Sequence, residues 1–383
     1  MRLWNTETRN LQPLRGGADP VGVYVCGITP YDTTHLGHAF TYVTFDVLIR
    51  TLRAAGREVR YVQNVTDVDD DIMKRARELG TTWDRLAADE TALYQADMAA
   101  LNVLPPDVFP RASETIDKII ELNARLVAQG HAYVREGNVY FRVRSVTDYG
   151  RLSRLPPDEM VRLSADRGAD PEDPRKQDPL DFLVWQRSAA DEPRWESPWG
   201  DGRPGWHIEC SAMALQHLGE QVDIHGGGAD LIYPHHESEI AQSESVTGVR
   251  PFARTWMHVG MLRFEGEKMS KSLRNLVLVR DLLPRFDADS IRVTLLRHHY
   301  REAWEYREDE LVEAAAWVGR LRAGAGGQPP GGGVAPTAAI LEALEDDLDT
   351  PRALDGLERA AQLDAPGWRQ AAGLLGLRLS DRQ

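Results

Sequence analysis

Two cysteines and one run of histidine and glutamate supply the residue types of a metal site. Cys26 ends an expected strand, Cys210 lies far along the chain, and Pro234-His235-His236-Glu237-Ser238-Glu239 opens an expected helix. If that helix begins at about His235, then His235 and Glu239 project on one face, because residues four apart on a helix are neighbours. Two thiolates, an imidazole and a carboxylate form a credible zinc set. Two cysteines can also be small buried apolar residues, so the set needs further support.

A zinc ion held by these residues would bind the thiolate of a substrate directly. Such ligation excludes the hydroxyl analogue far more strongly than an apolar pocket does, since an added hydroxyl changes binding in an apolar pocket only modestly. The set therefore predicts a site that selects a small thiol.

A second element, His35-Leu36-Gly37-His38, lies between an expected strand and an expected helix. The backbone N–H groups and the dipole at a helix N-terminus favour a phosphate. Two imidazoles there can donate to phosphoryl oxygens, and Gly37 allows a nucleotide to approach the backbone. Taken alone, the four residues are weak support, because roughly two thirds of such short matches are two loop histidines near a turn.

A third element, Lys268-Met269-Ser270-Lys271-Ser272, follows the last expected sheet strand. Lys268 and Lys271 on a loop of small residues can close over a triphosphate and stabilise the charge that develops as pyrophosphate leaves. The alternative is a solvated basic turn, which the pairing with the histidine element disfavours. Neither a Walker A sequence nor a Rossmann glycine fingerprint follows the first strand, so a P-loop ATPase and a nicotinamide dehydrogenase are disfavoured.

A glycine run, Gly226-Gly227-Gly228-Ala229-Asp230, precedes the histidines. Glycines allow the backbone to approach an adenosine, and Asp230 could accept hydrogen bonds from a ribose or a substrate ammonium group. A flexible loop is the alternative interpretation.

The elements that must position these residues alternate between strand and helix. The run from Val21 to Gly27 predicts a buried strand that delivers Cys26 to its C-terminal edge, where ligands bind in open parallel sheets. Further strands are expected over residues 58–65, 221–225 and 255–261, and helices over 38–54, 72–101, 113–129 and 235–246. This alternation predicts an α/β fold with a doubly wound, Rossmann-like parallel sheet.

The chain of 383 residues is too long for one ordinary hydrophobic core. The expected division is a first half of the nucleotide-binding catalytic domain over 1–130, an insertion over 131–205, a second catalytic half over 206–265, the lysine loop with a helical stem over 266–322, a Gly- and Pro-rich linker over 323–336, and a short helical tail over 337–383.

Composition limits the class of protein. The hydrophobic share of 42% and the charged share of 27% are typical of a globular domain, and no segment approaches the roughly 20 apolar residues of a membrane span. The start of the chain lacks an export signal, so a cytoplasmic location is expected. Two cysteines argue against a disulfide framework, and a net charge of −14 provides no general attraction to nucleic acid.

From about residue 3 to about residue 360 the chain resembles the cysteinyl-tRNA synthetase superfamily of class I synthetases. The matching segments are Cys26-Gly27, His35-Leu36-Gly37-His38, Asn64-Val65-Thr66-Asp67-Val68-Asp69-Asp70, Asp178-Pro179-Leu180-Asp181, Gly202-Arg203-Pro204-Gly205-Trp206-His207-Ile208-Glu209-Cys210, Pro234-His235-His236-Glu237 and Lys268-Met269-Ser270-Lys271-Ser272.

The resemblance implies a class I synthetase fold and a role for each matched position. Zinc would be held by Cys26, Cys210 and His235, and by Glu239 if it acts as in the synthetases. The residues implied to line the cysteinyl-adenylate pocket are Gly27, Thr29, Thr41, Asn64, Thr66 and Trp206. Those implied to hold adenosine are Gly228, Asp230 and Met261, and those implied to serve the phosphates are His35, His38, Lys268 and Lys271.

The superfamily contains two kinds of enzyme, which differ in the acceptor. One charges tRNA with cysteine, and the other joins cysteine to the amine of glucosaminyl-inositol in mycothiol biosynthesis. Three segments resemble the second kind: Gly27-Ile28-Thr29-Pro30-Tyr31-Asp32, Asp166-Arg167-Gly168-Ala169-Asp170-Pro171 and His299-Tyr300-Arg301-Glu302. The 47 residues after residue 336 carry five Lys and Arg against nine Asp and Glu, which also favours a small acceptor.

Two details point the other way or depart from both patterns. Ser238-Glu239-Ile240-Ala241-Gln242-Ser243-Glu244 resembles the tRNA-charging enzymes, and Arg274 stands where both kinds usually have a glycine.

We therefore expect an ATP-dependent, AMP-forming cysteine ligase that uses L-cysteine, ATP with Mg²⁺, an amino-sugar acceptor and zinc, and no membrane. The alternatives are a cysteine-tRNA ligase without a full anticodon-binding domain, with tRNA as its partner, and an inactive homologue that binds cysteine.

Overall fold

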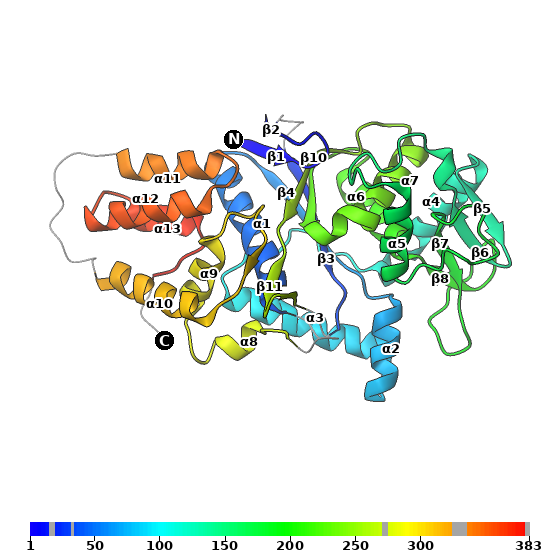
Figure 1. Ribbon diagram of the computed structural model, residues 1–383, viewed down its shortest axis with the longest axis horizontal. Coiled ribbons are helices and arrows are strands. Elements are labelled where there is room, and N and C mark those ends of the chain that lie inside the picture. The colour runs from blue at the N-terminus through cyan, green and yellow to red at the C-terminus, as the bar shows by residue number, and fades with distance from the viewer. Residues whose placement is uncertain (15–19, 32–33, 270–274, 324–334, 380–383) are drawn as a thin grey trace.

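A four-stranded parallel sheet lies at the centre of the computed structural model, which describes residues 1–14, 20–31, 34–269, 275–323 and 335–379 (Figure 1). Its strands follow the order β10-β9-β3-β4, and all neighbours run parallel. Their bounds are Val21–Ile28 for β3, Val59–Val65 for β4, Val222–Gly228 for β9 and Ala253–Val259 for β10. Most of their residues are buried, as expected for parallel strands covered on both faces. The predicted doubly wound α/β sheet is confirmed.

The alternation of side chains along β3 decides which residues meet. Val23 and Val25 pack in the large core that includes α1 (Leu36–Ala54). Tyr24 and Cys26 point to the opposite side, into a core that Cys210 of α6 also joins. The strand period of two residues thus brings the two cysteines into one hydrophobic cluster.

Helix α6 (Trp206–Leu218) and a break after residue 79 differ from the sequence-based expectation. No separate helix was expected over 206–218, because its consecutive buried residues from His207 to Ala214 hide the amphipathic period. The helical pattern expected over 72–101 is divided into α2 (Asp70–Leu79) and α3 (Trp83–Ala100). Gly80 adopts a left-handed conformation with φ 66° and so ends α2.

The segment between the two halves of the sheet builds a small antiparallel sheet of its own, in the order β5-β6-β7-β8. The elements of this part are α4 (Ile116–Ala128), β5 (Ala132–Arg135), β6 (Asn138–Phe141), α5 (Pro157–Asp166), β7 (Phe182–Arg187) and β8 (Gly202–Pro204). A separate hydrophobic cluster joins α4 to these strands and to α6. The part lies at one end of the molecule in Figure 1.

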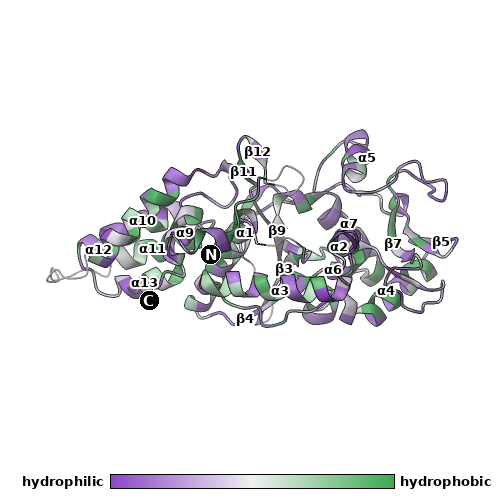
Figure 2. Ribbon diagram, turned by 90° about the horizontal axis from the view of Figure 1, so that it is seen from below, coloured by the Kyte–Doolittle hydropathy of each residue, from purple (hydrophilic) through white to green (hydrophobic). Residues whose placement is uncertain are grey.

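Helices near the C-terminus form the opposite end, and the view of Figure 2 keeps the same order of parts along the long axis. They are α9 (Ala288–Leu296), α10 (Glu308–Ala323), α11 (Ala335–Glu345), α12 (Thr350–Gln362) and α13 (Trp368–Leu374), and the short α8 (Val279–Leu282) precedes them nearer the middle of Figure 1. Fully buried Arg292 of α9 joins them to α1, because it pairs with Asp46 at 2.5 Å and donates to the carbonyl oxygen of Leu375 at 3.0 Å. In the described residues after the linker, α11, α12 and α13 lie where a short helical tail was expected.

Short elements complete the fold. They are β1 (Arg2–Asn5), β2 (Asn10–Pro13), β11 (Leu262–Phe264), β12 (Glu267–Lys268), β13 (Trp304–Glu305), the 3-10 turns Ala112–Glu114, Val143–Ser145 and Ala229–Leu231, the π-helical turn Ile232–His236, and α7 (Glu237–Thr247). Among the described residues, no helix combines the length and the apolar character that a membrane crossing requires.

Candidate active site

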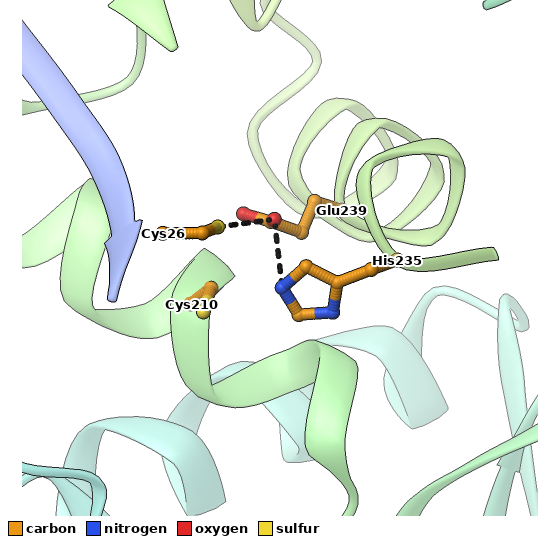
Figure 3. A group of neighbouring side chains, drawn as sticks. All are labelled: Cys26, Cys210, His235 and Glu239. Carbon is orange, nitrogen blue, oxygen red and sulfur yellow. Dashed lines mark hydrogen bonds and ion pairs between the residues drawn. The ribbon is translucent and has the colours of Figure 1, made fainter. Parts of the chain in front are cut away.

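The four predicted metal ligands converge at the C-terminal edge of the sheet (Figure 3). Cys26 comes from the end of β3, Cys210 from the first turns of α6, His235 from the π-helical turn, and Glu239 from α7. One ligand atom from each lies within 4.8 Å of the others. The expected helical contact is present as well, since His235 Nε2 lies 3.2 Å from Glu239 Oε1.

Burial and hydrogen bonding show that this cluster fits a metal ion. All four side chains are buried, and the Cys26 thiol donates to Glu239 Oε1 at 3.5 Å. Glu239 Oε2 accepts no hydrogen bond among the described residues, although His225 Nε2 lies 3.4 Å away. Burying a carboxylate with so few hydrogen-bonding partners destabilises the folded chain, and a bound cation would offset that destabilisation. The mixture of sulfur, nitrogen and oxygen donors is that of zinc-type sites.

Burial works against the charged form of three of the candidate ligands. It raises the pKa of Glu239 and of the Cys26 thiol well above their ordinary values, and it lowers the pKa of His235. A divalent cation reverses this tendency for the thiol and the carboxyl group by favouring the thiolate and the carboxylate, and like burial it favours the neutral imidazole.

A second set, Cys26, His225, His236 and Glu239, also has its ligand atoms within 4.8 Å of one another. It shares two members with the first set, and its two histidines do not line the large cavity described below. His236 Nε2 lies 3.3 Å from Cys26 Sγ, which places this imidazole behind the thiol. We interpret the two histidines as supporting partners that orient the ligands from behind.

Sequence reasoning missed these supporting histidines. In the sequence, His225 stands at the end of an expected strand, and His236 lies inside a matching segment without a predicted role. His207 was missed in the same way, and its Nδ1 lies 2.9 Å from His235 Nδ1, which turns the Nε2 atom of His235 toward Glu239. The available signal was a histidine inside a buried strand that ends in three glycines.

The metal cluster opens onto a cavity of about 950 Å³. The predicted site residues that line it are Cys26, Gly27, Thr29, His35, His38, Thr41, Asn64, Thr66, Trp206, Cys210, Gly228, Asp230, His235 and Met261. Glu239 is absent from this lining and lies behind the cavity wall. Residues predicted to bind the substrate thiol, the phosphates and the adenosine therefore line one cavity.

The end of the cavity next to the metal cluster is shaped by polar contacts around Gly27. Its N–H donates to Asn64 Oδ1 at 2.8 Å, and Asn64 Nδ2 donates to Thr66 Oγ1 at 3.1 Å. A Cβ atom on Gly27 would lie 1.6 Å from the carbonyl oxygen of Asn64, so only glycine fits. The Trp206 ring stacks on His235 with centroids 4.5 Å apart.

The histidine element caps α1 at the cavity. His35 is the N-cap, and its Nδ1 accepts from Gly37 N at 3.1 Å. The rings of His35 and His38 stack with centroids 3.9 Å apart. Both imidazoles thus stand at the positive end of a helix of 19 residues, where an anion is stabilised.

The remaining predicted residues lie at the other end of the site or outside the described chain. Asp230 Oδ2 lies 3.5 Å from Arg167 Nη2, and Met261 follows β10. Lys268 belongs to β12. Lys271 and Arg274 lie outside the described residues.

The chain is similar to known proteins over most of its length. A family model described as the catalytic domain of class I (C) tRNA synthetases matches residues 13–316. A protein of Acidothermus cellulolyticus named L-cysteine:1D-myo-inositol 2-amino-2-deoxy-alpha-D-glucopyranoside ligase is 48% identical over 92% of this chain and 87% of its own length. A protein of the same name from Kribbella flavida is 44% identical over 99% of this chain and 96% of its own length.

A cysteine–tRNA ligase of Paramagnetospirillum magneticum is 49% identical over 94% of this chain and 78% of its own length. Among solved structures, methionyl-tRNA synthetase of Mycobacterium tuberculosis in complex with methionyl-adenylate superposes with a TM-score of 0.68 at 19% identity, over 94% of this chain and 88% of that one. At that identity the likeness shows the fold alone, and it agrees with the parallel sheet described above.

Proposed function

The chain belongs to the family of class I (C) tRNA synthetase catalytic domains, and from this premise we propose that it activates L-cysteine with ATP and transfers the cysteinyl group to the amine of glucosaminyl-inositol. The observation that carries the proposal is the opening of the metal cluster, through Cys26, Cys210 and His235, onto the same cavity as the phosphate-binding histidine element. A thiol-selective centre and a phosphate-binding helix end therefore face one substrate space.

The proposed metal is zinc, held by Cys26, Cys210, His235 and Glu239. When bound there, zinc supplies direct ligation of the substrate thiolate and so separates cysteine from serine. His225, His236 and His207 orient the ligands through their contacts with Cys26 and His235.

The residues around Gly27 would hold the amino acid. Asn64 and Thr66 present polar atoms beside Gly27, and Trp206 covers His235. Thr29 and Thr41 line the same cavity. Together these groups fix the cysteine carboxylate relative to the phosphates, and such positioning is a large part of catalysis between two bound reactants.

Activation proceeds by in-line attack of the cysteine carboxylate on the α-phosphorus of ATP, with pyrophosphate as the leaving group. His35 and His38 donate to phosphoryl oxygens at the N-terminus of α1, and Lys268 and Lys271 are proposed to stabilise the departing pyrophosphate with Mg²⁺. The acceptor amine then attacks the carbonyl carbon of cysteinyl-AMP, forms the amide and releases AMP. No covalent enzyme intermediate is needed.

Two features of the chain itself also favour glucosaminyl-inositol as the acceptor. The segment His299-Tyr300-Arg301, which resembles the ligases, binds the helical tail: the Tyr300 hydroxyl donates to Asp347 Oδ1 at 2.7 Å, and Arg301 Nε lies 2.7 Å from Asp347 Oδ2. Residues 337–383 carry five basic against nine acidic side chains, so this tail offers no attraction to a polyanion.

Transfer to tRNA is the second candidate. It is favoured by the place of Glu239 in the metal cluster, which resembles the tRNA-charging enzymes, and by the 49% identity to a cysteine–tRNA ligase.

The test combines an activation assay with an acceptor assay. Cysteine should drive exchange of labelled pyrophosphate into ATP, and serine should not. With both acceptors offered in parallel, AMP release and amide formation should require glucosaminyl-inositol, and cysteine tRNA should stay uncharged. Charging of the tRNA with no reaction of the amino sugar would overturn the proposed acceptor, and absence of cysteine-dependent exchange would overturn the enzyme activity itself.

A further inference from the structure

One face of α2 lines the cavity although neither cysteine nor ATP has been assigned to it. Asp71, Lys74, Arg75 and Glu78 all line this space. They occupy positions i, i+3, i+4 and i+7 of α2, which lie along one side of a helix. The cavity wall here is therefore a continuous charged stripe.

The orientation of this stripe is fixed by packing on the other side of α2. Ile72 and Ala76 are buried in a small cluster with Leu86, against which Tyr31 and Trp83 pack. Asp69 caps the helix by accepting from Asp71 N at 2.8 Å. The apolar side therefore holds the helix in place, and the charged side is left to face the cavity.

Two contacts within the stripe hold its side chains in defined positions. The Tyr31 hydroxyl donates to Asp71 Oδ2 at 2.7 Å. Arg75 Nη1 donates to Glu78 Oε2 at 3.1 Å. Tyr31 also lines the cavity, two residues beyond Thr29, so the stripe adjoins the end where cysteine is proposed to bind. A molecule held on α2 would thus share one cavity with the cysteinyl group.

The chemistry of the stripe suits a neutral polyol. It carries two carboxylates and two cationic groups, so its formal charges cancel while it offers both acceptors and donors. Sugar and cyclitol hydroxyl groups each donate and accept, and they can bond to both kinds of side chain. A phosphate-rich strand would instead favour a surface with an excess of cations.

We propose that this face of α2 binds the hydroxyl groups of the polyhydroxylated amino-sugar acceptor, with Lys74 and Glu78 as specificity-determining contacts. The inference rests on the proposed function, because it assigns the acceptor of that reaction to a place in the cavity. Lys74 and Glu78 line the cavity and are exposed to solvent, so an acceptor can reach them after cysteinyl-AMP has formed.

The experiment compares Lys74→Ala and Glu78→Gln with a control on the same helix. Arg77→Ala removes a charge of the same kind as Lys74→Ala, but Arg77 is not among the residues that line the cavity and pairs with exposed Asp191 at 2.9 Å. Each of the first two variants should raise the KM for glucosaminyl-inositol about tenfold, the effect of losing one hydrogen bond to a charged group. Cysteine-dependent pyrophosphate exchange should stay within about twofold of the unmodified chain, because the first half-reaction does not use the acceptor. Arg77→Ala should change neither quantity.

The outcomes separate the inference from the function on which it rests. If the unmodified chain uses glucosaminyl-inositol and both variants keep its KM, the assignment of α2 is wrong while the proposed function stands. An equal loss of exchange and transfer would also overturn it, since α2 would then serve cysteine or ATP. If the unmodified chain activates cysteine but never transfers it to glucosaminyl-inositol, the proposed acceptor fails, and the assignment fails with it.

Discussion

The Sγ atom of Cys26 lies 3.5 Å from the Oε1 atom of Glu239, although the two residues are 213 positions apart in the chain. A strand end and a helix face from opposite halves of the sheet thus form one buried contact. Cys210 and His235 complete the group, and the four ligand atoms lie close enough together, within 4.8 Å of one another, to share one metal ion.

Substitution of Cys210 should remove the metal and the activity together. Cys210→Ser replaces a soft thiolate by a hydroxyl that binds zinc weakly, so zinc content should fall well below one ion per chain. Cysteine-dependent pyrophosphate exchange should fall by at least about 100-fold, because losing a direct ligand costs no less than losing a partner that orients one, which costs about 10- to 100-fold. Metal analysis of the purified chain and the exchange assay measure the two effects. Met213→Leu, a change of similar volume in the same helix, should preserve both. Full zinc content in Cys210→Ser would contradict the assignment.

A histidine behind the cluster should tune the affinity for the metal. His236 Nε2 lies 3.3 Å from Cys26 Sγ, and His236 Nδ1 lies 2.7 Å from His258 Nε2, so His236 connects the thiol to a second buried imidazole. His236→Asn should weaken zinc binding by about 10- to 100-fold, as expected for a partner that orients a ligand. Competition with a chromophoric chelator measures that affinity. His217→Asn, near the end of α6 and outside the cluster, serves as the control. Equal affinities in the two variants would show that His236 has no supporting role.

The sequence predicted the strand that carries Cys26 because its β-branched run ends in glycine at the edge where parallel strands bind ligands. It also predicted the pairing of His235 with Glu239, since a spacing of four residues is a local property of a helix. Both expectations depend on short stretches of chain, and both agree with the geometry.

The supporting histidines could not be predicted in the same way. His225 meets Cys26 and Glu239 only because β9 pairs with β3, which is a long-range property of the sheet order. Helix α6 was missed for a related reason. It is buried from His207 to Ala214, so tertiary packing removes the polar face that an amphipathic pattern requires. The end of α2, in contrast, has a local signal in the sequence, because Gly80 is a typical helix C-terminal residue.

A methyl group at Gly27 should lower the stability of the fold. The Cβ atom of Gly27→Ala would lie 1.6 Å from the carbonyl oxygen of Asn64, so β3 and β4 would have to separate. The free energy of unfolding should fall by about 3 kcal/mol or more, at the upper end for overpacking, and urea denaturation measures it. Gly22→Ala in the same strand is the matched control, because its Cβ atom would meet only Leu218 at 3.4 Å and Asp223 at 3.8 Å. Its unfolding free energy should stay within about 1 kcal/mol of the unmodified chain. Equal stabilities of the two variants would refute the steric argument.

Asp69, the N-cap of α2, should make the stability depend on pH in acid solution. Burial, assisted by repulsion from Asp71 and Asp70, raises the pKa of Asp69 to about 6. The unfolded chain loses this proton near pH 4, before the folded chain does, so stability contributed by this group falls as pH rises from about 4 to about 6 and is level above that range. Asp69→Asn keeps an acceptor for the Asp71 N–H but removes the titration. The difference in unfolding free energy between Asp69→Asn and the unmodified chain should therefore grow in favour of the variant from pH 4.5 to pH 6.5, as measured by urea denaturation at each pH. A difference that is constant across this range would mean that Asp69 titrates alike in both states.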